Sequence, residues 1–406
     1  MRGTWMAIGA VALAASLAAT PATAQESDFE AWLDGVRDEA REKGIAAETL
    51  DAALADVRPI ERVIELDRSQ PEFIRTFWSY MDNRVTPGRV EKGRRLLKKH
   101  RDLLQKVQRE HGVQPRFLIA FWGMETGFGD HLGSFPVIGS VATLAHDDRR
   151  GDFFRTQLFH ALRIVDEGHI DPSAFEGSWA GATGHLQFLP STFTRHAVDA
   201  DGDGRKDIWG DLRDVFASGA NYLSQMGWEG DERWGREVRL PEDFPWKEAQ
   251  LDVKKTLDSW AEMGVRKANG EPLPAPEGWQ GSIVLPQGHE GPAFLVYENF
   301  RHILSWNRSV KYGVAVGQLA DRIAGMPKIR TGRDTDSGAV SFEQVERIQT
   351  LLNELGHEAG PVDGVPGEST RAAIRRFQLA NQYPADGYAS PRLLERLKAR
   401  ATPGEG

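Results

Sequence analysis

Apolar side chains recur every three or four residues over most of the chain before residue 327, a spacing typical of amphipathic helices. Between residues 230 and 297 short apolar runs alternate instead with Pro and Gly, as in strands. The pattern therefore predicts a mainly α-helical body with a small β-containing lobe. The predicted helices cover residues 28–40, 46–56, 71–81, 88–111, 115–126, 153–167, 190–197, 212–226, 299–306 and 314–323, and the predicted strands cover 237–240, 281–285 and 293–297.

The helical pattern stops over residues 327–340, which are polar and unpatterned and so predict a linker. After the linker, the chain repeats a turn followed by a helix, and a unit of about sixty residues can fold as a small three-helix module. Its predicted helices cover 345–355, 370–378 and 391–397. We therefore divide the chain into residues 1–24, 28–326, 327–340 and 341–400.

The first residues are typical of a secretory signal. Arg2 precedes an apolar run that ends at Ala19, and Ala22-Thr23-Ala24 has the small-x-small form of a cleavage site. The chain has no cysteine, which excludes disulfides, thiolate metal sites, a Cys nucleophile and lipid attachment at a cleavage-site Cys. We expect residues 1–24 to be removed on export, leaving a periplasmic protein with no membrane anchor.

The charge and the aromatic content narrow the range of partners. The formal net charge of −9 makes nucleic acid a poor partner, because phosphate binding needs basic clusters. Twelve tryptophans fit flat apolar ligands such as sugar rings, or simply a large core.

Glu125 is a single carboxylate in an apolar, aromatic and glycine-rich segment. It continues the apolar stripe of the predicted 115–126 helix, which Gly127 ends. A Glu in that position is poorly solvated, which raises its pKa toward neutral, as a general acid requires. The alternative is a Glu that faces solvent or pairs with Arg116 or Arg149.

A second candidate site is an Asp-rich segment that begins at Asp199. Its carboxylates stand at loop positions 1, 3, 5 and 9 with Gly at position 6, which is the order of a calcium-binding loop. Without a cation these carboxylates would repel one another, and the alternative is a solvated acidic turn. The candidate ligands are Asp199, Asp201, Asp203, the backbone carbonyl of Arg205, and either Asp211 or Asp214, since position 12 is Gly210.

A third candidate is the run of small residues from Ser178 to Gly184 that precedes Gln187 and a helix started by Pro190. Small side chains let a bulky ligand approach the backbone, and Ser178 and Gln187 could hydrogen-bond to it. The alternative is close packing of helices on the glycines.

These three motifs, in this order, resemble the membrane-bound lytic murein transglycosylase B family over about residues 30–325. The tail, with Gln349, Asp363-Gly364 and Phe377-Gln378, resembles the peptidoglycan-binding three-helix module. The resemblance implies a lysozyme-like helical fold and a cleft for glycan strands of alternating N-acetylglucosamine and N-acetylmuramic acid. It leaves open whether wall-synthesis enzymes are partners.

The resemblance also implies roles for individual residues. Glu125 matches the sole catalytic acid, and no cofactor is expected for catalysis. The Ca²⁺ expected in the Asp-rich segment has a structural role only. The family's type member is a lipoprotein, whereas this chain has no Cys to which a lipid could be attached. Trp306 stands where the family usually has Tyr, and this exchange keeps a stacking face but loses a hydroxyl. The implied cleft residues are Tyr80, Arg149, Arg150, Ser178, Gln187, Tyr222, Trp306, Asn307 and Tyr312.

The implied reaction is a non-hydrolytic cleavage that forms 1,6-anhydro-N-acetylmuramic acid ends. Two alternatives stay open at this point. One is a hydrolase of lysozyme type, in which Asp130 or a neighbouring Asp supplies the second carboxylate that hydrolysis uses. The other is a wall-binding scaffold without activity.

Overall fold

The computed structural model describes residues 21–69, 76–147, 149–274, 278–332 and 338–401. The helices before the sheet are α1 (Pro21–Glu42), α2 (Ala47–Leu54), α3 (Glu61–Ser69), α4 (Phe77–Arg84), α5 (Pro87–Lys99), α6 (Arg101–His111), α7 (Pro115–Thr126), α8 (Val137–His146), α9 (Gly151–Asp166), α10 (Pro190–His196) and α11 (Leu212–Gln225). The later helices are α12 (Leu257–Glu262), α13 (Glu298–Trp306), α14 (Val310–Ile323), α15 (Phe342–Glu354), α16 (Glu368–Ala380) and α17 (Pro391–Ala401).

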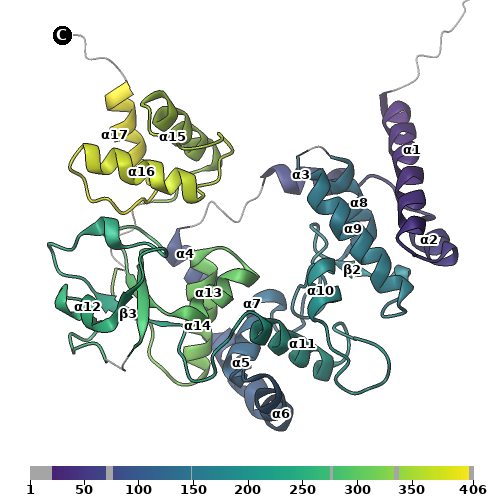
Figure 1. Cartoon of the computed structure of the whole chain (residues 1–406), viewed down its shortest axis with the longest axis horizontal. Coiled ribbons are helices and arrows are strands. Elements are labelled where there is room, and N and C mark those ends of the chain that lie inside the picture. The colour runs from purple at the N-terminus through teal and green to yellow at the C-terminus, as the bar shows by residue number, and fades with distance from the viewer. Residues whose placement is uncertain (1–20, 70–75, 148, 275–277, 333–337, 402–406) are drawn as a thin grey trace, which may run out of the picture.

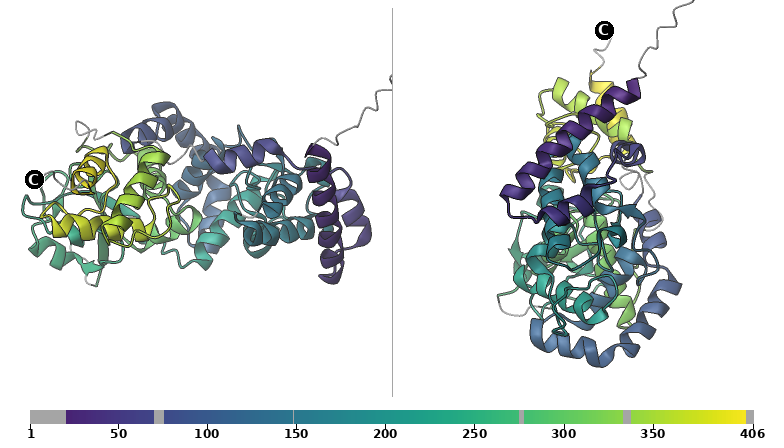
Figure 2. Two further views of the ribbon diagram at one scale, coloured as in Figure 1. Left: turned by 90° about the horizontal axis from the view of Figure 1, so that it is seen from above. Right: turned by 90° about the vertical axis from the view of Figure 1, so that its right-hand side faces the viewer.

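The helical body is elongated, with α1 at one end and the C-terminal helices at the other (Figure 2). In its middle, α7 packs against α14, α5 and α6, and α11 lies beside it (Figure 1). At the α1 end, α8 and α9 pack together and α10 packs on α9. Most of α7 and all of α8 up to Ala145 are buried, so both helices are covered by neighbouring elements on nearly every side. The confirmed fold class is thus mainly α-helical, with α7 at its centre.

Most predicted helices are confirmed, but three predictions needed correction. The single helix predicted over 88–111 is two helices, because His100 leaves helical geometry with φ −103° and ψ 23°. The helix predicted over 71–81 begins at Phe77, after the N-cap Thr76, and residues 70–75 lie outside the described part. The pattern missed α3, α8 and α12, and α8 carries no helical period because it is buried all round.

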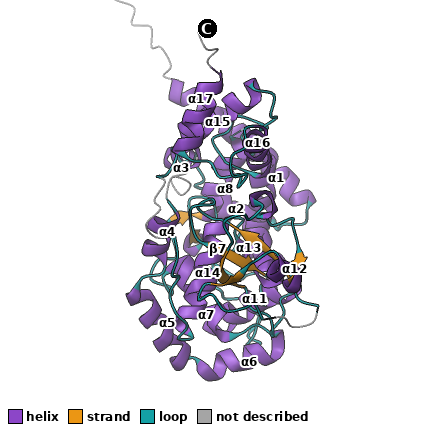
Figure 3. Cartoon of the chain, turned by 90° about the vertical axis from the view of Figure 1, so that its left-hand side faces the viewer, coloured by secondary structure: helices purple, strands orange, loops and turns teal. Residues whose placement is uncertain are grey.

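A small antiparallel sheet forms the β-containing lobe beside α12, α13 and α14 (Figure 3). Its strand order is β4-β6-β7-β3-β5, with Val238 opposite Ala293 and Ile283 opposite Leu295. The lobe has its own core, which includes the fully buried side chains of Trp260 and Tyr297. The strands are β3 (Gly235–Arg239), β4 (Lys255–Thr256), β5 (Arg266–Lys267), β6 (Gln280–Val284) and β7 (Ala293–Val296), and a separate pair joins β1 (Phe135–Pro136) to β2 (Glu176–Gly177).

The C-terminal module is a three-helix unit with a separate core that includes Ile348, Ile374 and Leu394. The predicted internal repeat is visible in two equivalent turns. In the first, the Gln349 side chain donates to Asp363 and accepts from Gly364 N–H. In the second, the Gln378 side chain donates to Asp386 and accepts from Gly387 N–H. We call each arrangement a Gln–Asp–Gly turn.

The second Gln–Asp–Gly turn contacts the β-containing lobe. The Asp386 carboxylate accepts from the backbone N–H of His289 at 2.9 Å and lies 2.6 Å from its ring Nδ1. Arg392 forms an ion pair with Glu290 beside it. The module is therefore docked on the body rather than only tethered to it.

The first part of the predicted linker is also tied to the body. Thr331 donates through its N–H and its hydroxyl to Glu237, and Gly332 C=O accepts from the indole N–H of Trp78. Residues 333–337 lie outside the described part.

Most of the predicted signal segment, residues 1–20, also falls outside the described part, and the expected cleavage site at 22–24 lies at the start of α1. None of the described helices combines the length and the apolar composition needed to cross a bilayer.

Candidate active site

Glu125 lies in the last turn of α7. Pro115 starts this helix at a position where its missing N–H costs nothing, and Gly127 ends it with φ 65°, a left-handed conformation in which its N–H bonds to Trp122 C=O. The helix is buried around Glu125, which itself is half-buried. Burial raises the pKa of the Glu125 carboxyl to about 7, against the lowering effects of a hydrogen bond from Tyr312 and of the Arg84 charge. The carboxyl is therefore substantially protonated at neutral pH.

Tyr312, in the first turn of α14, is the direct partner of this carboxyl. Its hydroxyl donates to Glu125 Oε1. Burial, followed by the nearby Glu125 charge, raises the pKa of Tyr312 well above 10, so the phenol remains a donor. Because α14 packs along α7, this contact joins two residues that are 187 positions apart.

Tyr80 and Arg84 approach Glu125 from α4. Burial and the Glu125 charge raise the pKa of the half-buried Tyr80, and the Arg84 charge lowers it. The Arg84 guanidinium lies 5.8 Å from the centre of the Tyr80 ring. Sequence reasoning missed Arg84, although its position four residues after Tyr80 on one helix places both on the same face.

Asp130, the candidate second carboxylate, is in a different environment. It is exposed and accepts from Lys92 Nζ at 2.5 Å, and that hydrogen bond lowers its pKa. The alternative partners of Glu125 are also engaged elsewhere, since Arg116 lies over the Phe117 ring and Arg149 pairs with Asp67. Among the described residues, no second carboxylate shifts the pKa of Glu125.

Aromatic side chains line the region beside Glu125. Phe121, one turn before Glu125 on α7, stacks on Trp306 with ring centres 4.4 Å apart. Tyr222 from α11 meets Trp306 edge to face at 5.0 Å and donates to Ser305 C=O. The exposed Asn307 caps the end of α13, and its side chain accepts from Ser309 N–H. Trp306 thus occupies a packed aromatic position, with Asn307 beside it at the surface.

Ser178 and Gln187 lie on the loop that the small-residue run forms. The Ser178 hydroxyl accepts from Ala182 N–H, and the Gln187 amide donates to Leu132 C=O at 2.9 Å. Gln187 has φ 50°, which is unusual for a residue with a side chain. The two side chains therefore order the loop itself, which passes next to the turn after α7.

Arg149 and Arg150 are brought together, but on Asp67 of α3. Arg149 bonds to both the carboxylate and the C=O of Asp67, and Arg150 bonds to the other carboxylate oxygen. Both arginines line a cavity of about 440 Å³ with Trp32, Phe153 and Arg155. The described contacts therefore link this pair to the α3 and α9 end of the body and not to Glu125.

The carboxylates of Asp199, Asp201 and Asp203 converge, with one oxygen of each within 4.8 Å of the others. Asp199 accepts from Gly202 and Gly204 N–H, which shapes the loop as a calcium loop requires and, with its largest effect through Gly204, lowers the pKa of Asp199. An all-oxygen donor set of this kind fits a hard cation.

The last ligand is the part of the prediction that the geometry constrains most. Asp214 is buried at the start of α11, and its two oxygens accept from Ala200 and Asp207 N–H at 2.8 and 2.7 Å. Asp211 instead caps α11 and pairs with Arg213. The Arg205 side chain donates to His169 C=O, away from the loop. Asp214 thus binds the backbone of the loop at Ala200 and Asp207, while Asp211 belongs to the helix cap.

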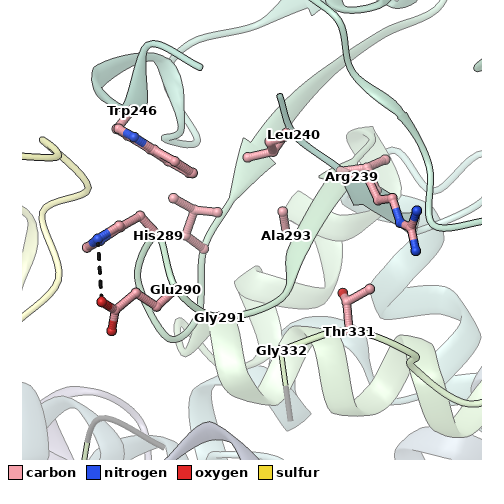
Figure 4. A pocket seen from close by; sticks show the side chains of 11 residues that line it. Arg239, Leu240, Trp246, His289, Glu290, Gly291, Ala293, Thr331 and Gly332 are labelled. Carbon is pink, nitrogen blue, oxygen red and sulfur yellow. Dashed lines mark ion pairs between the residues drawn. The ribbon is translucent and has the colours of Figure 1, made fainter. Parts of the chain in front are cut away.

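A further cavity of about 290 Å³ lies in the β-containing lobe (Figure 4). Trp246 and His289 stand on one side and Arg239 on the other, and Glu290 forms an ion pair with His289 (Figure 4). None of the candidate site residues lines this cavity. The active site is therefore assigned from the chemistry around Glu125 and not from cavity size.

Comparison with known proteins identifies two domains in the chain. A family model described as transglycosylase SLT domain matches residues 28–321, and one described as putative peptidoglycan binding domain matches residues 342–397. The structure is similar to SltB3 from Pseudomonas aeruginosa in complex with NAG-anhNAM-pentapeptide and with NAG-NAM-pentapeptide. Each comparison gives 46% identity and a TM-score of 0.87 and covers 91% of this chain and 99% of that chain.

Two Escherichia coli proteins are more distant. Membrane-bound lytic murein transglycosylase B from strain K12 is 30% identical over 252 residues, which are 60% of this chain and 66% of that protein, just under two thirds of its length. The lytic transglycosylase Slt35 in complex with calcium is 26% identical over 72% of this chain and 92% of that chain, with a TM-score of 0.63. The match of the transglycosylase model to most of the chain shows that this protein belongs to the SLT-domain lytic transglycosylase family.

Proposed function

We propose that this chain cleaves the β-1,4 bond between N-acetylmuramic acid and N-acetylglucosamine in peptidoglycan and leaves 1,6-anhydro-N-acetylmuramic acid ends. The observation that carries the proposal is a carboxyl with a pKa of about 7 that is the lone acid at its site among the described residues. The solved relatives bound to NAG-anhNAM and NAG-NAM peptides support the substrate class.

The first step uses Glu125 as a general acid. The protonated carboxyl gives its proton to the glycosidic oxygen while C1 of N-acetylmuramic acid becomes oxocarbenium-like. Tyr312 and Arg84 then favour the carboxylate that results, because both lower the pKa of Glu125. The sugar's own 2-acetamido group can stabilise C1, so no protein carboxylate is needed across the bond.

The second step uses the same residue as a base. The Glu125 carboxylate takes the proton of the C6 hydroxyl of the same sugar, whose oxygen bonds to C1 and closes the 1,6-anhydro ring. Proximity favours this internal nucleophile over water, because an intramolecular group has a very high effective concentration. The proton returns to Glu125, and no water is consumed.

Product masses test this proposal against hydrolysis. Digestion of purified sacculi should give muropeptides whose reducing-end sugar is lighter by one water than a hydrolysis product. Wild-type chain and Glu125→Gln should be compared on the same sacculi. Products that carry the added water would establish a hydrolase, and intact sacculi with both proteins would establish a scaffold.

The Asp-rich loop is proposed to hold a structural Ca²⁺ through Asp199, Asp201, Asp203 and the Arg205 carbonyl, with Asp214 as the last acidic ligand. The fit of the three converging carboxylates and the calcium complex of Slt35 support this. The ion would crosslink the loop to α11 and would take no part in bond cleavage.

We propose that the protein acts in the periplasm after export.

We also propose that the C-terminal module holds the enzyme on the insoluble wall. Raising the local concentration of glycan around Glu125 increases cleavage without any new contact at the bond. Ending the chain after residue 340 should reduce activity on sacculi several-fold and leave turnover of a short soluble glycan nearly unchanged. Equal losses on both substrates, with a lower melting temperature, would mean that the docked module only stabilises the body.

A further inference from the structure

His185 bonds to the Asp-rich segment on one side and to α7 on the other. Its backbone N–H donates to Ile208 C=O at 3.0 Å, and its backbone C=O accepts from the Thr126 hydroxyl at 2.9 Å. Its ring Nδ1 accepts from the indole N–H of Trp122 at 2.8 Å. Trp122 lies three residues before Glu125 and Thr126 directly after it. His185 therefore forms hydrogen bonds on both sides of the proposed acid.

The hydrogen bonds fix the protonation of the His185 ring. An indole nitrogen is a donor only, so Nδ1 must be the acceptor and the ring proton lies on Nε2. Burial lowers the pKa of the imidazole, against the raising effects of the Trp209 backbone and of the Asp207 charge, so the ring is neutral at neutral pH. The backbone N–H and the neutral ring of His185 together thus join Ile208 to Trp122.

Two glycines show how closely the chain is packed around this bridge. A Cβ on Gly129, where φ is 83°, would lie 2.4 Å from His185 Cε1. A Cβ on Gly184, where φ is 70°, would lie 2.8 Å from atoms of Ile208. Contacts this short cannot exist, so the imidazole is confined between the turn after α7 and the segment that follows the acidic loop.

We propose that His185 is a positioning residue that fixes the last turn of α7 against the Asp-rich segment and so holds the Glu125 carboxyl toward Tyr312. The inference rests on the proposed role of Glu125 as the acid. It does not require an ion in the loop, because the bond to Ile208 is made by the chain itself. His185 touches neither the sugar nor the reacting atoms in this role.

The two ring nitrogens can be separated by substitution. In His185→Asn, the side-chain oxygen can stand near the Nδ1 position and accept from Trp122. In His185→Gln, the amide reaches the Nε2 position and leaves Trp122 without an acceptor. Trp122→Phe removes the same bond from the other side. A matched control is Trp228→Phe, because the Trp228 indole donates at 2.8 Å to Gln114, at the opposite end of α7.

The experiment measures kcat, KM, the pH profile and the melting temperature of the full-length chain on a soluble glycan. His185→Gln and Trp122→Phe should lower kcat about ten- to a hundredfold with little change in KM, since a displaced acid loses rate and not binding. Their activity should be lost at a lower pH than in wild type, because water reaching Glu125 lowers its pKa from about 7. The double variant should be no slower than the slower single one.

Amide hydrogen exchange supplies a readout that does not depend on activity. The N–H groups of Gly127 and Phe128, which bond to Trp122 C=O, should exchange faster in His185→Gln and Trp122→Phe. They should stay protected in Trp228→Phe and more protected in His185→Asn than in His185→Gln.

A lower melting temperature with unchanged kcat and pH profile would overturn the inference and leave His185 as ordinary packing. Wild-type behaviour of both His185→Gln and Trp122→Phe would also overturn it. The parent proposal fails separately, since an active Glu125→Gln would remove the proposed acid, whereas an inactive Glu125→Gln with normal His185 variants defeats only the positioning role.

Discussion

The end of α7 and the Asp-rich loop shift the pKa values of their carboxyl groups in opposite directions. Glu125 is a lone carboxyl, and burial raises its pKa to about 7. Asp199 is half-buried in a cluster of carboxylates, and backbone N–H groups, Gly204 first, lower its pKa. The comparison shows that exclusion of water raises the pKa of a carboxyl, whereas backbone donors lower it even among neighbouring carboxylates.

Asp130 shows that closeness to Glu125 in the sequence does not give a carboxyl a raised pKa. It lies five residues after Glu125, yet it is exposed and its hydrogen bond from Lys92 lowers its pKa. The turn at Gly127 carries it out of the buried region. Local burial therefore separates a proton donor from an ordinary surface ion pair within one turn of chain.

The largest expected effect comes from Glu125→Gln, which replaces the carboxyl at the end of α7 with an amide that cannot supply a proton. Loss of general acid catalysis should cost at least ~10²–10⁴ in rate on soluble glycan. The amide keeps the shape, so the melting temperature should not fall. A variant with more than about a tenth of wild-type activity would contradict the assignment, given the size of that expected loss.

The same variant tests the raised pKa through stability. A carboxyl whose pKa is raised on folding stabilises the fold below its unfolded value near 4.5, and this contribution is lost as pH rises through about 7. Wild type should therefore lose stability over that range relative to Glu125→Gln. Parallel unfolding curves at all pH values would show that burial does not perturb Glu125.

Removal of calcium by a chelator tests whether the Asp-rich loop binds a stabilising ion. At a calcium concentration a hundred times Kd, the ion should stabilise the fold by about 2.7 kcal/mol. Chelator should thus lower the melting temperature of wild type and of Asp130→Asn, but not of Asp199→Ala combined with Asp203→Ala. If chelator leaves wild type unchanged, the loop is only an acidic turn.

Tyr312→Phe should widen the difference between the two regions by keeping Glu125 protonated to a higher pH. Because the hydrogen bond from Tyr312 lowers the pKa of Glu125, its loss should raise that pKa above about 7 and extend activity to higher pH. The rate should fall about tenfold, since the carboxylate formed in the reaction loses a donor. Tyr297→Phe, at a buried tyrosine of the β-containing lobe, is the control that should leave the pH profile in place.

Asp130→Asn should have the smallest effect. An exposed ion pair contributes about 0–1 kcal/mol, so the stability should change little and the rate on soluble glycan should stay within about twofold of wild type. A loss as large as that of Glu125→Gln would restore the two-carboxylate alternative and with it a hydrolase.

Local signals in the sequence determined several elements in advance. Pro115 and Gly127 bound α7 because one lacks an N–H and the other adopts a left-handed turn without strain, and the predicted range of this helix matches the structure. The Asp-rich segment follows from residue spacing, and the three helices of the C-terminal module follow from its repeated turn-then-helix pattern. Such features depend mainly on residues close together in the chain.

Only the tertiary structure decided which distant groups meet. The contact of Tyr312 with Glu125 depends on α14 packing along α7, and the bridge through His185 depends on three separate segments. The ion pairs of Arg149 and Arg150 with Asp67 also join separate segments of the chain. Periodicity reports which face of a helix is buried and not which partner buries it, so the pKa of Glu125, the docking of Asp386 on His289 and the break at His100 could be learned only from the packed chain.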